Sequence, residues 1–139
     1  MITSVQDAGA GAAYRAGMII PTLRYDDALG AIDFLERAFG FERKAVYEDG
    51  GTVHHAELTY RRGMVMLGST GRGDPQFETR HCSAYVIVDD PDALHDRAKA
   101  AGAEITRELQ DTDYGSREFS ARDPEGNAWS FGTYDPFRD

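Results

Sequence analysis

The sequence predicts an α+β fold of two tandem βαβββ modules, with a mixed curved sheet that forms a cleft and helices on its outer face. Landmarks of the first half recur 63 residues later: Asp26-Asp27 as Asp89-Asp90, and Gly63 as Gly126. Landmarks of different chemical type that agree at one spacing indicate a duplicated supersecondary unit. Each unit has one amphipathic helix and a half-covered sheet, so helices packed on one face leave the other faces to line a cleft.

The first module is expected over residues 18–70. A strand is predicted at 18–25, with Pro21 indicating an edge position. Apolar residues then recur at helical spacing between Asp26-Asp27, which cap the helix, and Gly40, which ends it. Three further strands are predicted, at 43–48, 53–60 and 64–69.

The second module, over 81–135, repeats this plan. A strand at 83–88 leads into a helix that Gly102 stops, and strands follow near 103–109, 116–122 and 127–133. The segment Asp-Pro-Glu-Gly at 123–126 has the composition of a tight turn between the last two strands. Residues 1–17 are rich in Ala and Gly without hydrophobic periodicity, and are predicted to form a mobile N-terminal arm.

Composition excludes several classes of partner. The chain has 139 residues and a net charge of −9, which predicts one globular domain that repels nucleic acid and anionic membrane surfaces. No window approaches the roughly 20 apolar residues of a membrane span. The single cysteine, Cys82, cannot form an intramolecular disulfide, which favours a reducing compartment, so a cytoplasmic location is expected.

Local motifs add a family resemblance that covers residues 18–135. The motifs are Leu-Arg-Tyr-Asp-Asp at 23–27, Ala-Phe-Gly-Phe at 38–41, Tyr-Gly-Ser-Arg at 114–117 and Asp-Pro-Glu-Gly-Asn-Ala-Trp-Ser-Phe at 123–131. They resemble the vicinal oxygen chelate superfamily, which holds glyoxalase I, extradiol dioxygenases, fosfomycin-resistance enzymes and bleomycin-resistance proteins. The Asp-Pro-Glu-Gly-Asn turn is quite specific when it closes such a repeat, although alone it would indicate only a turn.

The resemblance implies four positions for a divalent metal, one on the first and one on the last strand of each module. Here they fall on Ile20, Ser83, Leu67 and Ser130. Neither aliphatic carbons nor neutral hydroxyls replace the imidazole and carboxylate ligands that such metals require. No metal or cofactor is therefore expected, and the chain is closest to the metal-free bleomycin-resistance-like branch, whose members are homodimers that sequester a drug at the subunit junction.

Within the family frame, the cleft is expected to be lined by side chains from the strands of both modules. Tyr85 and Phe119 could stack on planar rings, and Arg117 could hold a carboxylate or pair with Glu57. Trp129 and Phe131 are expected in the core. The predicted ligand-binding residues are Ile20, Thr22, His55, Glu57, Leu67, Ser83, Tyr85, Tyr114, Arg117, Phe119 and Ser130.

His55 and Glu57 are the candidate catalytic pair. His54 and His55 are adjacent on a strand, so only one can face the cleft. A three-residue hairpin loop places Glu57 opposite Leu67 and turns His55 and Glu57 into the cleft, whereas a four-residue loop reverses this. We favour the first, because it sends the neighbouring apolar residues toward the helix. The pair could supply acid–base chemistry, or be an ordinary polar strand pair.

Three functions are compatible with these observations. The first is a metal-free homodimer that sequesters an antibiotic-like or aromatic small molecule, with the acidic charge favouring cationic ligands. The alternative is a glyoxalase-like lyase or isomerase that uses non-family metal ligands or His55 and Glu57. The third is a partner-binding or regulatory module whose cleft is plugged by its own side chains. The ligand itself is not encoded in any motif, and His95, among charges on the second helix, is expected to be solvated.

Overall fold

The two predicted βαβββ modules are present in the computed structural model, which describes residues 16–73, 75 and 78–138. The predicted N-terminal arm lies outside the described residues except for positions 16 and 17. The first module comprises β1 (Thr22–Tyr25), α2 (Ala28–Phe39), β2 (Glu42–Asp49), β3 (Thr52–Tyr60) and β4 (Gly63–Ser69). The second comprises β5 (Ser83–Ile87), α3 (Pro91–Ala100), β6 (Glu104–Asp111), β7 (Arg117–Arg122) and β8 (Ala128–Gly132).

Each module forms its own four-stranded mixed sheet with the same topology. The strand orders are β1-β4-β3-β2 and β5-β8-β7-β6. In each sheet the first strand pairs in parallel with the last, and the remaining pairs are antiparallel. The predicted fold class is therefore confirmed.

Helix capping follows the predicted repeat. The Asp27 carboxylate accepts a hydrogen bond from the Gly30 amide at 3.0 Å, and Asp90 accepts one from the Ala93 amide at 3.1 Å. Each bond satisfies a backbone donor that the first turn of a helix leaves without a partner. Gly40 has a φ of 81°, the left-handed conformation in which glycine commonly ends a helix.

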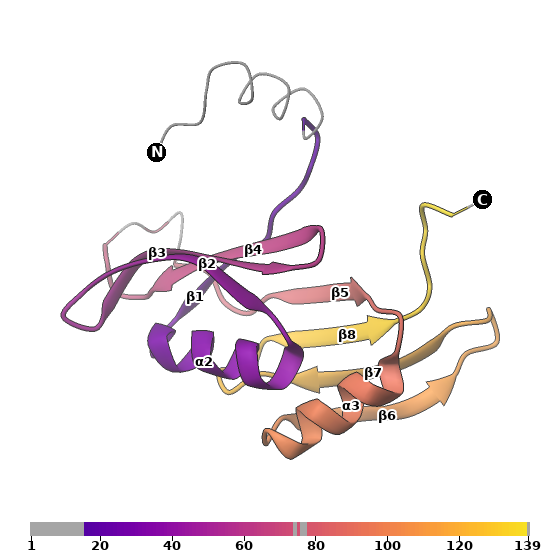
Figure 1. Cartoon of the computed structure of the whole chain (residues 1–139). Helices are drawn as coiled ribbons and strands as arrows, with labels where there is room; N and C mark the ends of the chain where they lie inside the picture. The colour runs from indigo at the N-terminus through magenta and orange to yellow at the C-terminus, as the bar shows by residue number, and fades with distance from the viewer. Residues whose placement is uncertain (1–15, 74, 76–77, 139) are drawn as a thin grey trace.

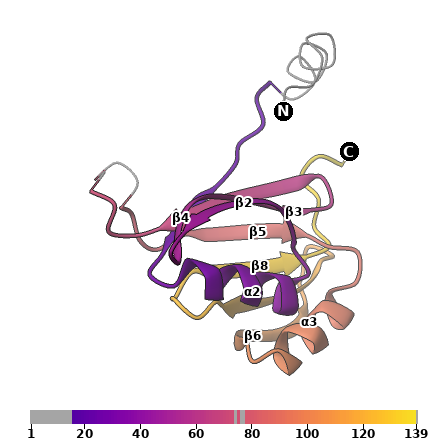
Figure 2. The ribbon, with the colours of Figure 1, turned by 60° about the vertical axis from the view of Figure 1, so that its left-hand side comes forward.

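One hydrophobic core joins the two modules. Helix α2 packs against α3 and lies between the first sheet and β8 (Figures 1 and 2). The ring of Phe39 on α2 lies 5.5 Å from Trp129 and 4.9 Å from Phe131, so the prediction that both β8 aromatics belong to the core is confirmed. Each sheet turns one face toward this core, and its other face, here called the open face, points away from the helices.

The turn between β7 and β8 connects the modules through a buried carboxylate. Asp123, 5% exposed, accepts hydrogen bonds from the Tyr25 hydroxyl at 2.7 Å and the Trp129 indole at 3.1 Å. It also accepts bonds from the backbone amides of Glu125 and Asn127. Burial, followed by the charge of Asp123, raises the pKa of Tyr25 far above its usual range, so the hydroxyl stays a donor.

Two further side chains of this turn hold neighbouring backbone. The Glu125 carboxylate accepts hydrogen bonds from the amides of Asp26 and Asp27, at 2.6 and 2.8 Å, where α2 begins. The Asn127 side-chain oxygen accepts a bond from the Cys82 amide at 2.8 Å, just before β5. The Asp-Pro-Glu-Gly-Asn segment is thus both a turn and the main polar connection between β1, α2 and β5.

The two modules differ in one respect that the uniform spacing does not predict. Tyr60 pairs with Gly63, so the loop of the first hairpin has two residues, whereas Arg122 pairs with Ala128 across residues 123–127. The predicted three-residue loop is therefore wrong. Leu67 pairs with Ala56 and is fully buried in the core, and Met66 occupies the open-face position expected for Leu67.

Neither helix in the described ranges is long and apolar enough to cross a membrane.

We predict that Asp123→Ala lowers the free energy of unfolding by about 3 kcal/mol, because it leaves the buried Tyr25 hydroxyl and Trp129 indole without an acceptor. Urea denaturation measures the effect. Asp113→Asn, at an exposed position, is the control and should change stability by less than about 0.5 kcal/mol. Equal stabilities of the two variants would contradict the assigned role of Asp123.

Candidate functional site

A pocket of about 380 Å³ lies on the open face of the second sheet. We call it the tyrosine pocket, because three of its lining residues are tyrosines. The structure brings four predicted ligand-binding residues together here: Ser83, Tyr85, Tyr114 and Ser130. The complete lining consists of Ser83, Ala84, Tyr85, Tyr114, Glu118, Ser130, Tyr134 and Pro136.

Small side chains form the floor of the tyrosine pocket. Side chains alternate between the faces of a strand, so the register that pairs Tyr85 with Ser130 places both on the open face. Along its other edge β8 pairs with β7, where Ser130 lies opposite Ser120, and the two hydroxyls share a hydrogen bond of 2.8 Å. The serines leave room above the sheet.

Glu118 of β7 brings a negative charge to the pocket. Its residue is only 9% exposed, and both carboxylate oxygens accept hydrogen bonds from the Tyr114 hydroxyl, at 3.0 and 3.1 Å. Gly132 lies opposite on β8, where a Cβ would come within 2.6 Å of Glu118 Cγ and 2.7 Å of the Tyr85 hydroxyl. The absence of a side chain at Gly132 therefore allows both groups to occupy this space.

The chain after β8 supplies a third tyrosine. The Tyr85 hydroxyl donates to the Tyr134 carbonyl at 2.8 Å, and the Tyr134 amide donates to Ser116 Oγ at 3.0 Å. The rings of Tyr114 and Tyr134 meet edge to face at 5.8 Å. Burial raises the pKa of Tyr85, and the hydrogen bond to Glu118 raises that of Tyr114, so both hydroxyls remain donors at neutral pH.

Four lining residues are not among the predicted ones: Ala84, Glu118, Tyr134 and Pro136. Tyr134 and Pro136 follow the last strand, in a segment without hydrophobic periodicity, and nothing in the sequence marks it as part of a site. Glu118 lies between two residues that were predicted, Arg117 and Phe119, and the correct strand register would have identified it.

The prediction that Arg117 and Phe119 line the cleft together with Ser130 is wrong. Ser120 pairs with Ser130, so the odd-numbered residues of this part of β7 point to the helix side. Phe119 is fully buried and stacks on Phe131 at 5.0 Å between ring centroids. Arg117 forms ion pairs with Asp92 of α3 at 2.6 Å and with Asp111 at 3.1 Å.

The prediction that His95 is solvated is also wrong. It is buried rather than solvated, because its ring packs edge-on against Phe119 at 5.3 Å. Its Nε2 atom lies 2.8 Å from a carboxylate oxygen of Glu108, which provides the polar partner that burial requires.

The candidate catalytic pair lies on the open face of the first sheet. His55 Nε2 and Glu57 Oε2 are 2.9 Å apart in a hydrogen bond, while Ala56 and Leu58 point into the core, as the favoured facing predicts. The hydrogen bond from His55 is the main cause that lowers the pKa of Glu57, and Lys44 contributes from 3.7 Å.

The other first-sheet candidates lie near this pair in the fold. Thr22 is exposed on β1, where it pairs with Met66, and Ile20 is half-buried just before the strand. Neither residue lines the tyrosine pocket. The predicted residues that lie away from the helices therefore fall into two groups, one at each sheet, whereas Leu67, Phe119 and Arg117 lie on the helix side.

The four family metal positions do not fit a divalent metal. Ser83 and Ser130 line the tyrosine pocket, Ile20 is aliphatic, and the corrected register puts the thioether of Met66 where Leu67 was expected. These groups lack the imidazole and carboxylate chemistry of such sites. Within the described part of the chain, no cluster of three or more His, Cys, Asp or Glu side chains could hold an ion.

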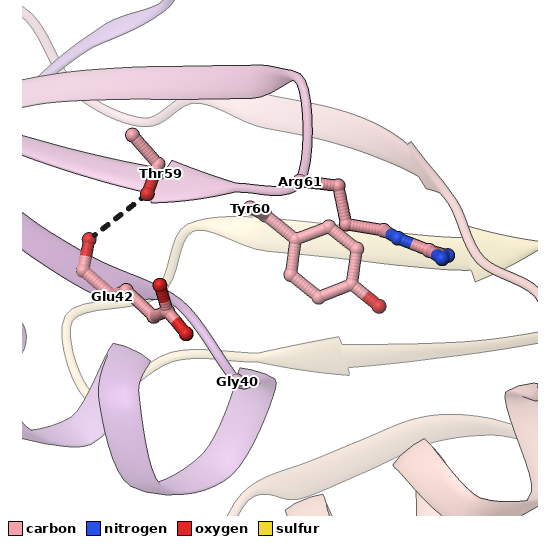
Figure 3. A pocket seen from close by; sticks show the side chains of 5 residues that line it. All are labelled: Gly40, Glu42, Thr59, Tyr60 and Arg61. Atoms are coloured by element: carbon pink, nitrogen blue, oxygen red, sulfur yellow. Dashed lines mark hydrogen bonds between the residues drawn. The ribbon is translucent and has the colours of Figure 1, made fainter.

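A second pocket, of about 350 Å³, lies where α2, β2 and β3 meet (Figure 3). It is lined by Gly40, Glu42, Thr59, Tyr60 and Arg61, and the Thr59 hydroxyl donates to the Glu42 carbonyl at 3.4 Å. Two of its side chains already have partners: Tyr60 packs on Phe41, and Arg61 forms an ion pair with Asp89 of the second module. None of the predicted site residues lies here.

Comparison with known proteins finds a family match over most of the chain. Residues 17–131 match the Glyoxalase/Bleomycin resistance protein/Dioxygenase superfamily. An uncharacterized protein of Mycobacterium bovis is 33% identical over 121 residues, which cover 81% of this chain and 80% of the relative. The crystal structure of TioX from Micromonospora sp. ML1 has a TM-score of 0.72 at 34% identity and covers 84% of this chain and 98% of TioX.

More distant structures share the fold alone. Lactoylglutathione lyase from Agrobacterium tumefaciens has a TM-score of 0.64 at 21% identity, over 84% of this chain and 92% of its own. The fosfomycin resistance protein FosX from Listeria monocytogenes, complexed with Mn(II) and sulfate, has a TM-score of 0.61 at 16% identity, over 87% and 94%.

We predict that His55→Ala raises the pKa of the Glu57 carboxyl toward its ordinary value of 4.5, because the main hydrogen bond to the carboxylate is lost. NMR titration of the glutamate side-chain carbons measures this. A carboxyl whose pKa is lowered by folding contributes stability above its unfolded pKa and loses it as pH falls through the folded value. His55→Ala should therefore destabilise the protein at pH 6 more than at pH 3.

The control is His54→Ala, which removes the neighbouring exposed imidazole and should leave the Glu57 titration unchanged. The same titration midpoint in wild type and His55→Ala would show that the two side chains are not coupled.

Proposed function

The chain belongs to the glyoxalase/bleomycin resistance protein/dioxygenase superfamily, and we propose that it binds and sequesters a small aromatic, antibiotic-like molecule without a metal. The observation that carries this proposal is the tyrosine pocket, where three tyrosine side chains surround a serine floor. Tyrosine rings stack on planar ligands, and a few fixed polar groups orient them. The volume of about 380 Å³ is within the range of small-molecule sites, which also argues against a plugged cleft.

Donor chemistry favours binding over metal-assisted catalysis. The superfamily description includes both enzymes and resistance proteins, so membership alone supports either function. Ile20, Met66, Ser83 and Ser130 are unsuited to Zn²⁺ or Mn²⁺, whereas Ser83 and Ser130 suit the floor of a ligand pocket.

We further propose that the complete site forms in a homodimer. Tyr85, Ile87 and Tyr134 are each more than one-third exposed on or beside the open face of the second sheet. A contiguous exposed apolar surface commonly marks a protein interface. The open face of the first sheet of a second copy would cover this surface and bring His55, Glu57, Ile20 and Thr22 to the ligand. The single cysteine, Cys82, supports a cytoplasmic location for this dimer.

The alternative function is a lyase or isomerase of the same superfamily. The observation that favours it is the His55–Glu57 hydrogen bond, in which a charged carboxylate orients an imidazole on an open sheet face. Such a pair can transfer protons to and from a substrate. The two functions differ in whether the bound molecule is released unchanged.

Isothermal titration against a panel of aromatic natural products, including bleomycin-type glycopeptides, should find a ligand that binds equally well before and after dialysis against a chelator. Tyr134→Ala should weaken this binding about tenfold, as expected for the loss of one stacking ring. Phe137→Ala, three residues further along and outside the pocket, is the control.

Absence of binding across the panel would contradict sequestration. One equivalent of Zn, Mn, Fe or Ni per chain, lost on replacing His55 or Glu57, would establish the enzymatic alternative instead. Recovery of a chemically altered ligand would also favour the enzyme.

Analytical ultracentrifugation at micromolar concentration should give twice the 15.3 kDa mass of the chain. Ile87→Glu should shift the protein to a monomer, because a charge on the apolar face opposes its burial. The matched control is Leu29→Glu on α2, since Leu29 is 36% exposed and Ile87 is 37% exposed. A wild-type protein that sediments at the mass of one chain would contradict the dimer.

A further inference from the structure

We infer that the ligand of the tyrosine pocket is an organic cation, whose ammonium group is held by Tyr85, Tyr114, Tyr134 and Glu118. This inference rests on the proposed function and specifies the chemical class of its ligand. The four side chains line one pocket, and they come from β5, the β6–β7 loop, the segment after β8, and β7. We call this group the cation cage.

Glu118 supplies a negative charge without a counter-ion. The residue is nearly buried, yet within the described ranges no Lys, Arg or His forms an ion pair with it. Its neighbour Arg117 points to the other face of the sheet and pairs with Asp92 and Asp111. Buried carboxylates are normally paired with a cation. A ligand ammonium would complete the pair.

Tyr85 and Tyr114 offer ring surface, rather than hydroxyl groups, to the ligand, and Tyr134 adds a third ring. The Tyr114 hydroxyl donates to Glu118 and the Tyr85 hydroxyl to the Tyr134 carbonyl, so both donors are already used. The three residues are each between 41% and 59% exposed. A cation over the face of an aromatic ring is attracted by the ring quadrupole, which is how aromatic cages recognise alkylated ammonium groups.

The same arrangement disfavours an anion. The Ser130 hydroxyl is paired with Ser120, and the Glu118 carboxylate would repel a negative ligand. The positive charge of Arg107 acts on Tyr114 and is the basic group that would favour an anion here. It is outweighed at longer range by the net charge of −9, which attracts cations to the protein.

The test compares two probes of equal shape and different charge. Choline carries a trimethylammonium group, and 3,3-dimethyl-1-butanol is its neutral analogue, with carbon in place of nitrogen. NMR titration of the full-length protein should show choline binding at least about tenfold more tightly than the alcohol. The Glu118→Gln variant should lose about tenfold in choline affinity and leave the affinity for the alcohol unchanged.

Glu104→Gln is the matched control, because it removes the same charge from an exposed position on the same sheet. Equal choline affinities in the Glu104→Gln and Glu118→Gln variants would overturn the inference, as would equal binding of the two probes. If Glu118→Gln fails to fold, Tyr134→Leu replaces it. Tyr134 is about half exposed after the last strand, and its loss should weaken choline binding while the far-UV circular dichroism is retained.

Failure of this inference can be distinguished from failure of the proposed function. If aromatic neutral compounds of the natural-product panel bind while choline has no advantage over its analogue, only the cation cage is wrong. If neither probe and no member of the panel binds, both proposals fail.

Discussion

The buried carboxylate of Asp123 is the interaction on which the arrangement of the two modules depends. It accepts hydrogen bonds from Tyr25 in the first module and from Trp129 in the second, and all three side chains are nearly inaccessible to solvent. A buried hydroxyl or indole without an acceptor is costly. The Tyr25 hydroxyl of the first module therefore finds its acceptor only when the second module is correctly docked, and Glu125 extends this dependence to the backbone amides at the start of α2.

The docking of the two modules at this carboxylate determines which face of the second sheet is available to a ligand. Helix α2 brings Phe39 against Trp129 and Phe131, so the inner face of β8 is covered. Because side chains alternate along a strand, Ser130 and Gly132 of the same strand face outward, beneath the tyrosines. The core and the candidate site thus lie on opposite faces of the same strand. The space that Gly132 leaves is taken by Glu118 and Tyr85.

The sequence predicts the fold and the capping positions well, because these depend on local chemistry that repeats. Asp27 and Asp90 cap helices in both modules, as their spacing indicates. Facing on the last strands is less predictable, because the two hairpin loops differ in length and a shift of one residue turns every side chain to the opposite face. Leu67 and Phe119 were misplaced for this reason, while Ser83, Tyr85, Tyr114 and Ser130 were found. Tyr134 belongs to the site through hydrogen bonds that no periodicity reveals.

The central claim is that ligands bind on the open face of the second sheet, and the tyrosines of the chain can report on it directly. NMR spectra of tyrosine-labelled protein, recorded with and without benzyltrimethylammonium, distinguish the two pockets. We expect the resonances of Tyr85, Tyr114 and Tyr134 to shift, while those of buried Tyr25 and of Tyr60, in the pocket of Figure 3, stay unchanged. A shift at Tyr60 with the other three resonances unchanged would contradict the account.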